Sequence, residues 1–166
     1  MKLALIVAVL CGSIGCAGGH KIKETSPLEG KLGAYSVVQI AAKSSDEDAG
    51  EDLGSFRSAL VAKLTERDLF KGYVTHEEPG AADLRLAVTL TGIRRVSETT
   101  RFLVGGMAGK AKLFADVELI EIGTGRTLGS FKIEGKSSGG TVAAGTTPEA
   151  VVNAANGIAQ YIADHR

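Results

Sequence analysis

Two segments show the two-residue alternation of a half-buried strand, with apolar residues at Leu84, Leu86, Val88 and Leu90, and at Ala111, Leu113, Ala115, Val117 and Leu119. Because successive side chains of a β-strand point to opposite faces, each segment presents one apolar face and one largely polar face. We therefore predict two strands of a sheet that buries one side against a core.

Three further segments are typical of strands: 35–40, 72–75 and 126–135. The last follows Gly123-Thr124-Gly125, which predicts a tight hairpin from the strand before it. Within the last segment Leu128 is out of phase with Phe131 and Ile133. We expect a β-bulge near Gly129, because one extra residue restores the phase of the alternation.

Two segments carry apolar residues at helical spacing. In the first, the apolar positions are Leu53, Phe56, Leu60 and Leu64, and in the second they are Val151, Ala155, Ile158 and Ile162. The second begins with Thr147-Pro148-Glu149, in which Thr is a good N-cap and Pro suits the first helical position. The order β-α-β-β-β-β-α predicts an α+β two-layer sandwich, with a mostly antiparallel sheet and both helices packed on one face.

The N-terminus resembles a bacterial lipoprotein signal. Lys2 is followed by the apolar run 3–10, which is shorter than the ~20 residues of a membrane-spanning helix and fits the apolar region of a signal peptide. Ser13-Ile14-Gly15-Cys16 then resembles a lipobox, with Ser13 where Leu is usual. We expect a signal peptide at 1–15, an acylated Cys16 and a flexible tether at 16–30, before a single domain at 31–166. Ordinary cleavage after Ala17 is the alternative.

The anchor predicts a location as well. Residue 17 is Ala rather than Asp. In a Gram-negative host the usual lipoprotein sorting pattern then implies the outer membrane, with the domain facing the periplasm. Membrane attachment through the acyl chains at Cys16 is the expected partner contact.

Composition narrows the function classes. The 166 residues contain 19 basic and 19 acidic side chains, so the chain has no net charge and a nucleic-acid partner is not expected. Glycine is abundant at 22 residues, and ten of these lie between Gly105 and Gly145, where the hairpins and loops are predicted.

No group of residues predicts catalysis, a metal site or a cofactor. His20, His76 and His165 are not at metal-ligand spacing. Asp116 and Glu118 share one strand face, and solvation of a polar sheet surface explains this carboxylate pair more simply than acid–base chemistry. We therefore expect a protein that is not an enzyme.

One connection between predicted strands is unusually apolar. Phe102–Gly109 carries no charge and is bracketed by Arg101 and Lys110. Either this segment folds back onto its own sheet, or its side chains meet a partner protein, another copy or a bilayer. In the second case the contact residues are Phe102, Leu103, Val104 and Met107.

The order of elements and three motifs resemble a family of small bacterial lipoproteins whose function is unknown. The motifs are Ala82-Asp83-Leu84, Gly106-Met107-Ala108-Gly109 and Glu121-Ile122-Gly123-Thr124-Gly125, and the resemblance covers about residues 31–165. At the level of fold, the layout is also similar to the N-terminal domain of TolB and to the lipoprotein PelC. These resemblances imply an interaction or assembly module for envelope proteins, including self-association. The alternative is a binder of a small ligand or glycan near Arg94, Arg95 and Arg101.

Overall fold

The computed structural model describes residues 18–75, 81–95, 109–138 and 146–166. Its elements are β1 (Gly19–Ser26), η1 (Leu32–Ala34), β2 (Val37–Ser44), α1 (Glu47–Gly50), α2 (Leu53–Glu66), β3 (Gly72–Val74), β4 (Leu84–Arg94), β5 (Lys112–Glu121), β6 (Thr127–Lys136) and α4 (Thr147–Asp164). No helix among these residues is long and apolar enough to cross a membrane.

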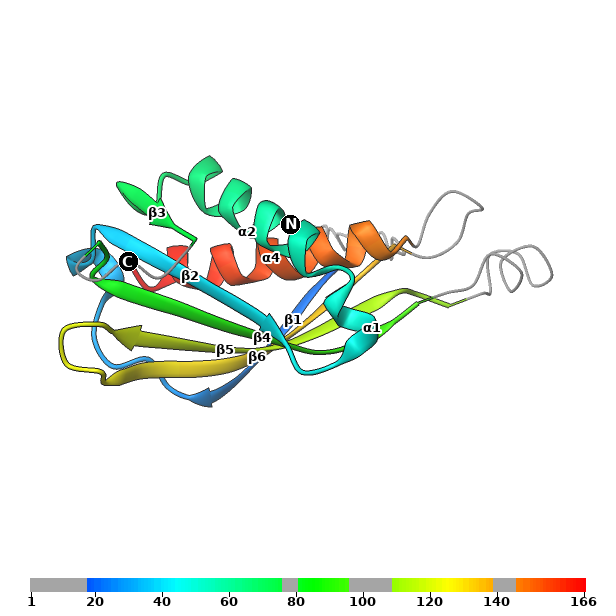
Figure 1. Cartoon of the computed structure of the whole chain (residues 1–166), viewed down its shortest axis with the longest axis horizontal. Coiled ribbons are helices and arrows are strands. Elements are labelled where there is room, and N and C mark those ends of the chain that lie inside the picture. Colours follow the sequence, from blue (N-terminus) through cyan, green and yellow to red (C-terminus); the bar gives the residue numbers. More distant parts are fainter. Residues whose placement is uncertain (1–17, 76–80, 96–108, 139–145) are drawn as a thin grey trace, which may run out of the picture.

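The strands form one six-stranded sheet in the order β1-β6-β5-β4-β2-β3. The four strands β1, β6, β5 and β4 pair antiparallel, whereas β2 lies parallel to both β4 and β3. The helices α2 and α4 pack together on one face of the sheet (Figure 1). The predicted α+β two-layer architecture, with both helices on one face, is therefore confirmed.

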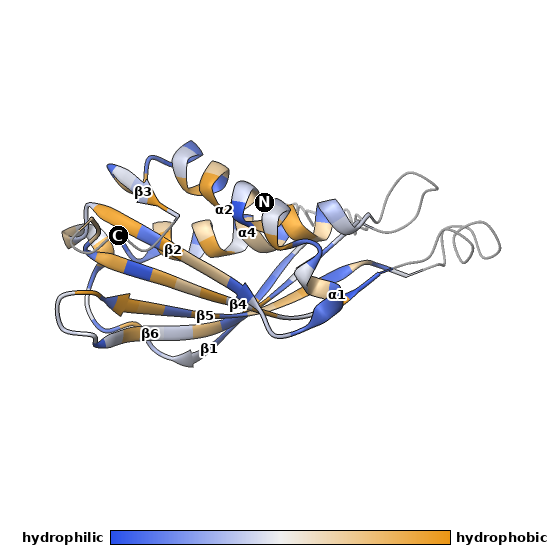
Figure 2. Cartoon of the chain, viewed as in Figure 1, coloured by the Kyte–Doolittle hydropathy of each residue, from blue (hydrophilic) through white to orange (hydrophobic). Residues whose placement is uncertain are grey.

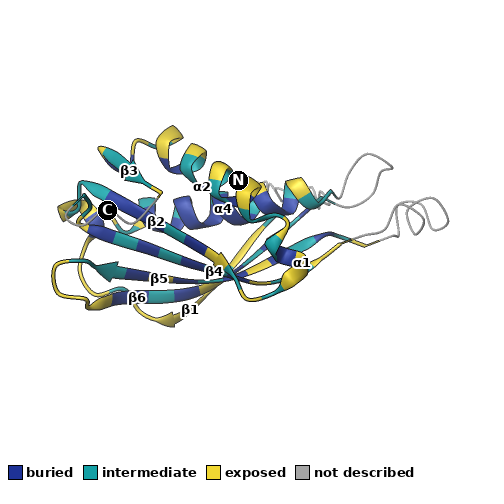
Figure 3. Cartoon of the chain, in the orientation of Figure 1, coloured by how far each residue is buried: buried dark blue, intermediate teal, exposed yellow. Residues whose placement is uncertain are grey.

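The core lies between the sheet and the two helices. The alternating residues of β4 and β5 are buried, as are Phe56, Leu60 and Leu64 of α2 and Ile158 and Ile162 of α4. Buried and less buried positions alternate along the central strands (Figure 3), and the hydropathy of the ribbon follows the same pattern (Figure 2). The period-two pattern thus identified the correct inner face of both strands.

Helix α4 approaches the sheet closely because small residues meet at the contact. A Cβ atom on Gly135 of β6 would lie 2.6 Å from the backbone nitrogen of Ala154. A Cβ atom on Gly157 of α4 would lie 2.6 Å from Ile133 Cδ1. Glycine at these two positions sets the spacing between the layers. The predicted N-cap is off by one residue, since the hydroxyl of Thr146 accepts a hydrogen bond from Glu149 N, at 3.3 Å.

The predicted bulge in the last strand is confirmed. Leu119 of β5 is opposite Gly129, and the next residue, Ile120, is opposite Thr127, so Leu128 is the extra residue. Leu128 is 2% exposed. The bulge therefore turns this leucine into the core despite its wrong phase.

The tether predicted for 16–30 is wrong for residues 19–26, which form β1. This strand pairs antiparallel with β6, and Ile22 lies opposite Ile133. The sequence pattern missed it because β1 is an edge strand with mostly exposed side chains, and Ile22 is its one large apolar residue. Backbone pairing with β6, rather than an apolar face, holds such a strand in place.

Candidate functional site: the open face of the sheet

One face of the sheet is left open by the described elements. Along β5, Leu113, Ala115 and Val117 face the helices, whereas Phe114 and Asp116 face the other way. The strand registers place the remaining side chains of this second face on β1, β2, β4 and β6. We call this surface the open face.

The open face carries more positive than negative side chains. Its cationic residues are Lys21, Lys23, Lys43, Arg85, Arg94, Lys112, Lys132 and Lys136, and its acidic residues are Asp116, Glu118 and Glu134. The whole chain has no net charge. The charges are therefore distributed unevenly, with a cationic excess on one side of the sheet.

Cross-strand ion pairs neutralise part of this excess. Lys132 Nζ lies 2.9 Å from Asp116 Oδ2, and Glu134 pairs with Lys112 at 2.6 Å and with Lys136 at 3.5 Å. Burial acts to raise the pKa of Glu134, but the two lysines outweigh it and the pKa is lowered. The carboxylate therefore stays charged at neutral pH and holds two neighbouring strands together.

Two lysines of the face, Lys21 and Lys23, have no such carboxylate partner among the described residues. Within the described parts of the chain, neither Lys21 nor Lys23 of β1 lies within ion-pair distance of a carboxylate. Both side chains are exposed. They are therefore available to an anionic group brought from outside.

An exposed aromatic residue lies beside these lysines. Phe114 is 37% exposed, and only one other large apolar side chain among the described residues, Val152 of α4, is comparably exposed, at 40%. A hollow of about 400 Å³ lies next to Phe114, lined by Lys21, Lys23 and Lys132 among others. The open face thus combines an aromatic ring, three lysines and the carboxylates of Asp116 and Glu134 around one hollow.

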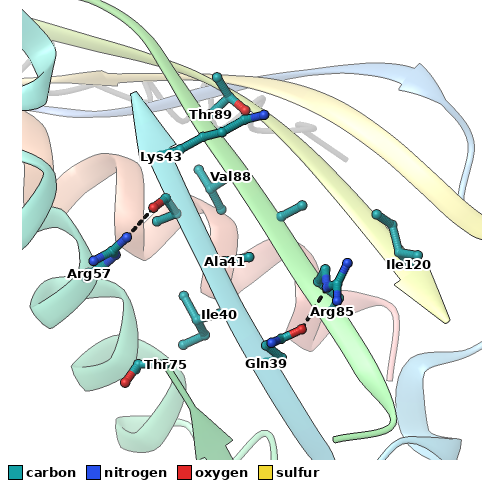
Figure 4. Close-up of a pocket in the computed structure, with 12 residues that line it drawn as sticks. Gln39, Ile40, Ala41, Lys43, Arg57, Thr75, Arg85, Val88, Thr89 and Ile120 are labelled. Carbon is teal, nitrogen blue, oxygen red and sulfur yellow. Dashed lines mark hydrogen bonds between the residues drawn. The ribbon is translucent and has the colours of Figure 1, made fainter. Parts of the chain in front are cut away.

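A second groove, of about 390 Å³, follows β2 (Figure 4). On the open face, Arg85 Nε donates a 2.7 Å hydrogen bond to the side-chain oxygen of Gln39. At the outer edge of β2, where β3 pairs only with Val37–Gln39, the Arg57 guanidinium donates to the carbonyl of Ala42. Arg57 of α2 thus covers a backbone carbonyl of β2 beyond the part of that strand that β3 pairs with.

A third polar group lies at the end of β5. Tyr35 Oη donates a 2.9 Å hydrogen bond to Glu121, and Thr124 Oγ1 donates to the other oxygen of the same carboxylate, at 2.5 Å. The bonds from Thr124 and then Tyr35 lower the pKa of Glu121, and burial together with Glu121 raises the pKa of Tyr35. The group fixes the β5–β6 hairpin, since the carboxylate has two hydroxyl donors.

The sequence-predicted site residues are distributed as follows. Cys16, Phe102, Leu103, Val104 and Met107 lie outside the described residues, as do His76 and Arg101. Arg94 is on the open face, whereas Arg95 pairs with Glu51 at 2.9 Å and Asp52 at 3.0 Å, beside the helices. The two arginines predicted to bind a ligand together therefore point to different surroundings.

The predicted polar face of β5 is confirmed, and its charges form part of the cationic surface. Asp116 and Glu118 both lie on the open face, but Asp116 is paired with Lys132. In the described ranges no three or more His, Cys, Asp or Glu side chains are grouped as a metal ion requires. Sequence reasoning missed the lysines of β1, because that segment was not predicted to join the sheet.

Comparison with solved structures identifies the fold. A PelC dodecamer from Paraburkholderia phytofirmans is 16% identical at a TM-score of 0.51, covering 84% of this chain and 93% of PelC. A second crystal form gives 14% identity and a TM-score of 0.52, covering 86% and 94%. A PDZ domain protein from Parabacteroides distasonis is 10% identical at a TM-score of 0.45, covering 87% of this chain and 36% of that protein.

No curated protein matches the chain. A family profile does match, over residues 20–143, and its description is a domain of unknown function, DUF4410. That range begins at the second residue of β1 and extends beyond β6, so it includes all six strands of the sheet. The chain therefore belongs to the DUF4410 family.

Proposed function

We propose that this protein is a membrane-anchored envelope lipoprotein whose domain acts as a non-enzymatic assembly module, binding further copies of itself or other envelope proteins. The observation that carries the proposal is the fold shared with PelC. The shared fold covers nearly all of the PelC chain, and the solved PelC structures are dodecamers. The fold is therefore compatible with a closed oligomer built from one kind of subunit.

The N-terminus supports the anchor. The lipobox-like Ser13-Ile14-Gly15-Cys16 follows a short apolar segment, and residue 17 is Ala rather than Asp, which the usual Gram-negative sorting pattern associates with the outer membrane. The anchor has a direct test. Wild-type protein should fractionate with membranes and Cys16→Ser protein should not. A Cys16→Ser protein that stays bound to membranes would contradict the lipoprotein proposal.

Assembly has a separate test. The apolar segment with Phe102, Leu103, Val104 and Met107 is the proposed protein contact. Met107→Asp should reduce the sedimentation coefficient or the yield of crosslinked oligomer in intact cells. Ser55→Asp, which places the same charge on an exposed position of α2, serves as the control. Equal assembly of Met107→Asp and wild type would exclude this contact.

Binding of a small ligand or glycan is the second candidate, and the groove along β2 favours it. The groove has hydrogen-bonding side chains on two strands and a volume of about 390 Å³, within the range of small-ligand sites. Saccharides of different charge can be titrated while the amide signals of Gln39 and Arg85 are followed by NMR. Unchanged signals across the series would exclude this role for the groove.

A further inference from the structure

The distance between the proposed anchor and the folded domain is short. β1 begins at Gly19 and is paired with β6 from its first residue, opposite Lys136. Cys16 is three positions earlier, so its Cα lies at most about 11 Å from that of Gly19. An acyl chain on Cys16 would therefore hold one edge of the sheet at the level of the lipid headgroups.

The edge strand held in this way, β1, contributes side chains to the open face. Lys21 and Lys23, the third and fifth residues of β1, are exposed there without an ion-pair partner among the described residues. The face carries eight cationic and three acidic side chains. Anionic headgroups attract lysines near their surface, and the attraction acts within about 8 Å, the screening length at physiological salt.

Acidic side chains are concentrated away from this face. Asp46, Glu47, Asp48, Glu51 and Asp52 lie in and around α1, whose Ala49 is buried in the core on the helix side. Among them, Arg95 compensates Glu51 and Asp52. An anionic surface would therefore be attracted to the open face and repelled by this corner of the helix layer, which favours one orientation.

Phe114 adds an apolar contact beside the lysines. Its ring is partly exposed beside the hollow that Lys21, Lys23 and Lys132 line. An aromatic ring inserts favourably at the boundary between headgroups and acyl chains, while lysines keep their ammonium groups at the headgroups. The arrangement of ring and lysines matches a bilayer surface.

We propose that the open face lies against a bilayer containing anionic lipids, with Lys21, Lys23 and Phe114 in contact with it. This inference rests on the proposed acylation of Cys16, and it replaces a domain that hangs free on a tether with one held flat on the membrane. The acyl chains supply most of the affinity, and the open face sets the orientation. The helix layer, with its acidic corner, then faces away from the lipid.

Lysine footprinting of the whole protein tests this orientation. Protein purified from membranes is placed in phosphatidylglycerol-rich vesicles, in phosphatidylcholine vesicles or in detergent, and labelled with an amine-reactive reagent. In the anionic vesicles Lys21 and Lys23 should label about five-fold more slowly than in detergent, because the headgroups hold their ammonium groups. Lys31 and Lys71, exposed in loops outside the sheet, should label equally in all three and serve as internal controls.

Two variants sharpen the test. Phe114→Ala should reduce the protection of Lys21 and Lys23, whereas Val152→Ala, which truncates the other exposed apolar side chain, should not. Equal labelling of Lys21 and Lys23 in anionic vesicles and detergent would overturn the proposal. Protection that persists in detergent and grows with protein concentration would also overturn it, since a second copy would then cover the face.

The same samples separate this proposal from the lipoprotein proposal. The mass of the N-terminal peptide reports whether Cys16 carries acyl chains. An unmodified Cys16 would contradict the proposed anchor, while footprinting with excess vesicles would still decide whether the open face binds lipid. An acylated protein with unprotected lysines would instead leave the anchor intact and exclude the orientation.

Discussion

The hydroxyl of Tyr161 on α4 donates a 2.9 Å hydrogen bond to the carboxylate of Glu24 on β1, although the two residues are 137 positions apart in the chain. The Tyr161 ring also packs against Phe131, with ring centroids 4.1 Å apart. One side chain thus connects the last helix to the edge strand and to the strand beside it. The bond shows that β1 belongs to the folded domain.

The alkaline stability of the protein should depend on Tyr161. Burial, and then the bond to Glu24, raise the pKa of this hydroxyl to about 12, from about 10 in an unfolded chain. The folded state therefore favours the protonated form, and the stabilisation is complete below about pH 10 and is lost as the pH rises through about 12. The difference in urea midpoint between wild type and Tyr161→Phe should be constant up to about pH 10. Above that pH the wild-type midpoint should fall relative to that of the variant. A difference that is unchanged in the alkaline range would contradict this linkage.

Replacing Gly135 by Ala should destabilise the protein. The new methyl group would lie 2.6 Å from Ala154 N, so α4 would have to move away from β6. We expect a loss of about 1–3 kcal/mol in the free energy of unfolding, the usual range for overpacking. Gly123→Ala is the control, because a Cβ there has no atom within 4 Å. Similar urea curves for the two variants would show that the layers can separate at little cost.

Residues 19–26 should be protected from hydrogen exchange. Half of the backbone amides of an antiparallel edge strand face its neighbour, so those of β1 that bond to β6 should exchange at least about tenfold more slowly than in the unfolded chain. Mass spectrometry of the peptide, with the urea-unfolded protein as reference, measures this protection. Exchange at the unfolded rate would restore the interpretation of the segment as a tether.

Arg57→Ala should expose the outer edge of β2. The guanidinium donates to the carbonyl of Ala42, and its loss should lower the free energy of unfolding by about 1 kcal/mol. Lys63→Ala removes an exposed ion pair with Glu66 on the same helix and should lower the free energy of unfolding less than Arg57→Ala does. Equal stability of the two variants in urea would show that water replaces the arginine without loss.

Most elements that the sequence predicted bury a regular apolar face. Leu84 to Leu90 of β4 and Val151 to Ile162 of α4 pack against the core, so burial is recorded directly in their spacing. The residues of β1 show no such apolar spacing, because pairing with β6 uses backbone groups that every residue carries. The edge strand β1 could therefore be recognised only in the three-dimensional structure.

The candidate site was predicted only in part, for a related reason. Asp116 and Glu118 were correctly placed on the polar face of their strand, because alternation fixes the face within one strand. Alternation does not fix which strand lies beside it, so the approach of Lys132 to Asp116 depends on the strand register. The cationic excess of the open face arises from side chains on five strands, and the sequence of no single strand predicts it.

The pairing of β1 with β6 also constrains the order of folding. Ile22 lies opposite Ile133, so the first strand of the sheet cannot make its native pairing until a segment about 110 positions later is available. In a chain that crosses a membrane N-terminus first, Gly19–Ser26 would emerge early and wait unpaired for Thr127–Lys136. The exposed lysines that characterise β1 in the folded protein would also keep the waiting strand soluble and discourage pairing with the wrong edge.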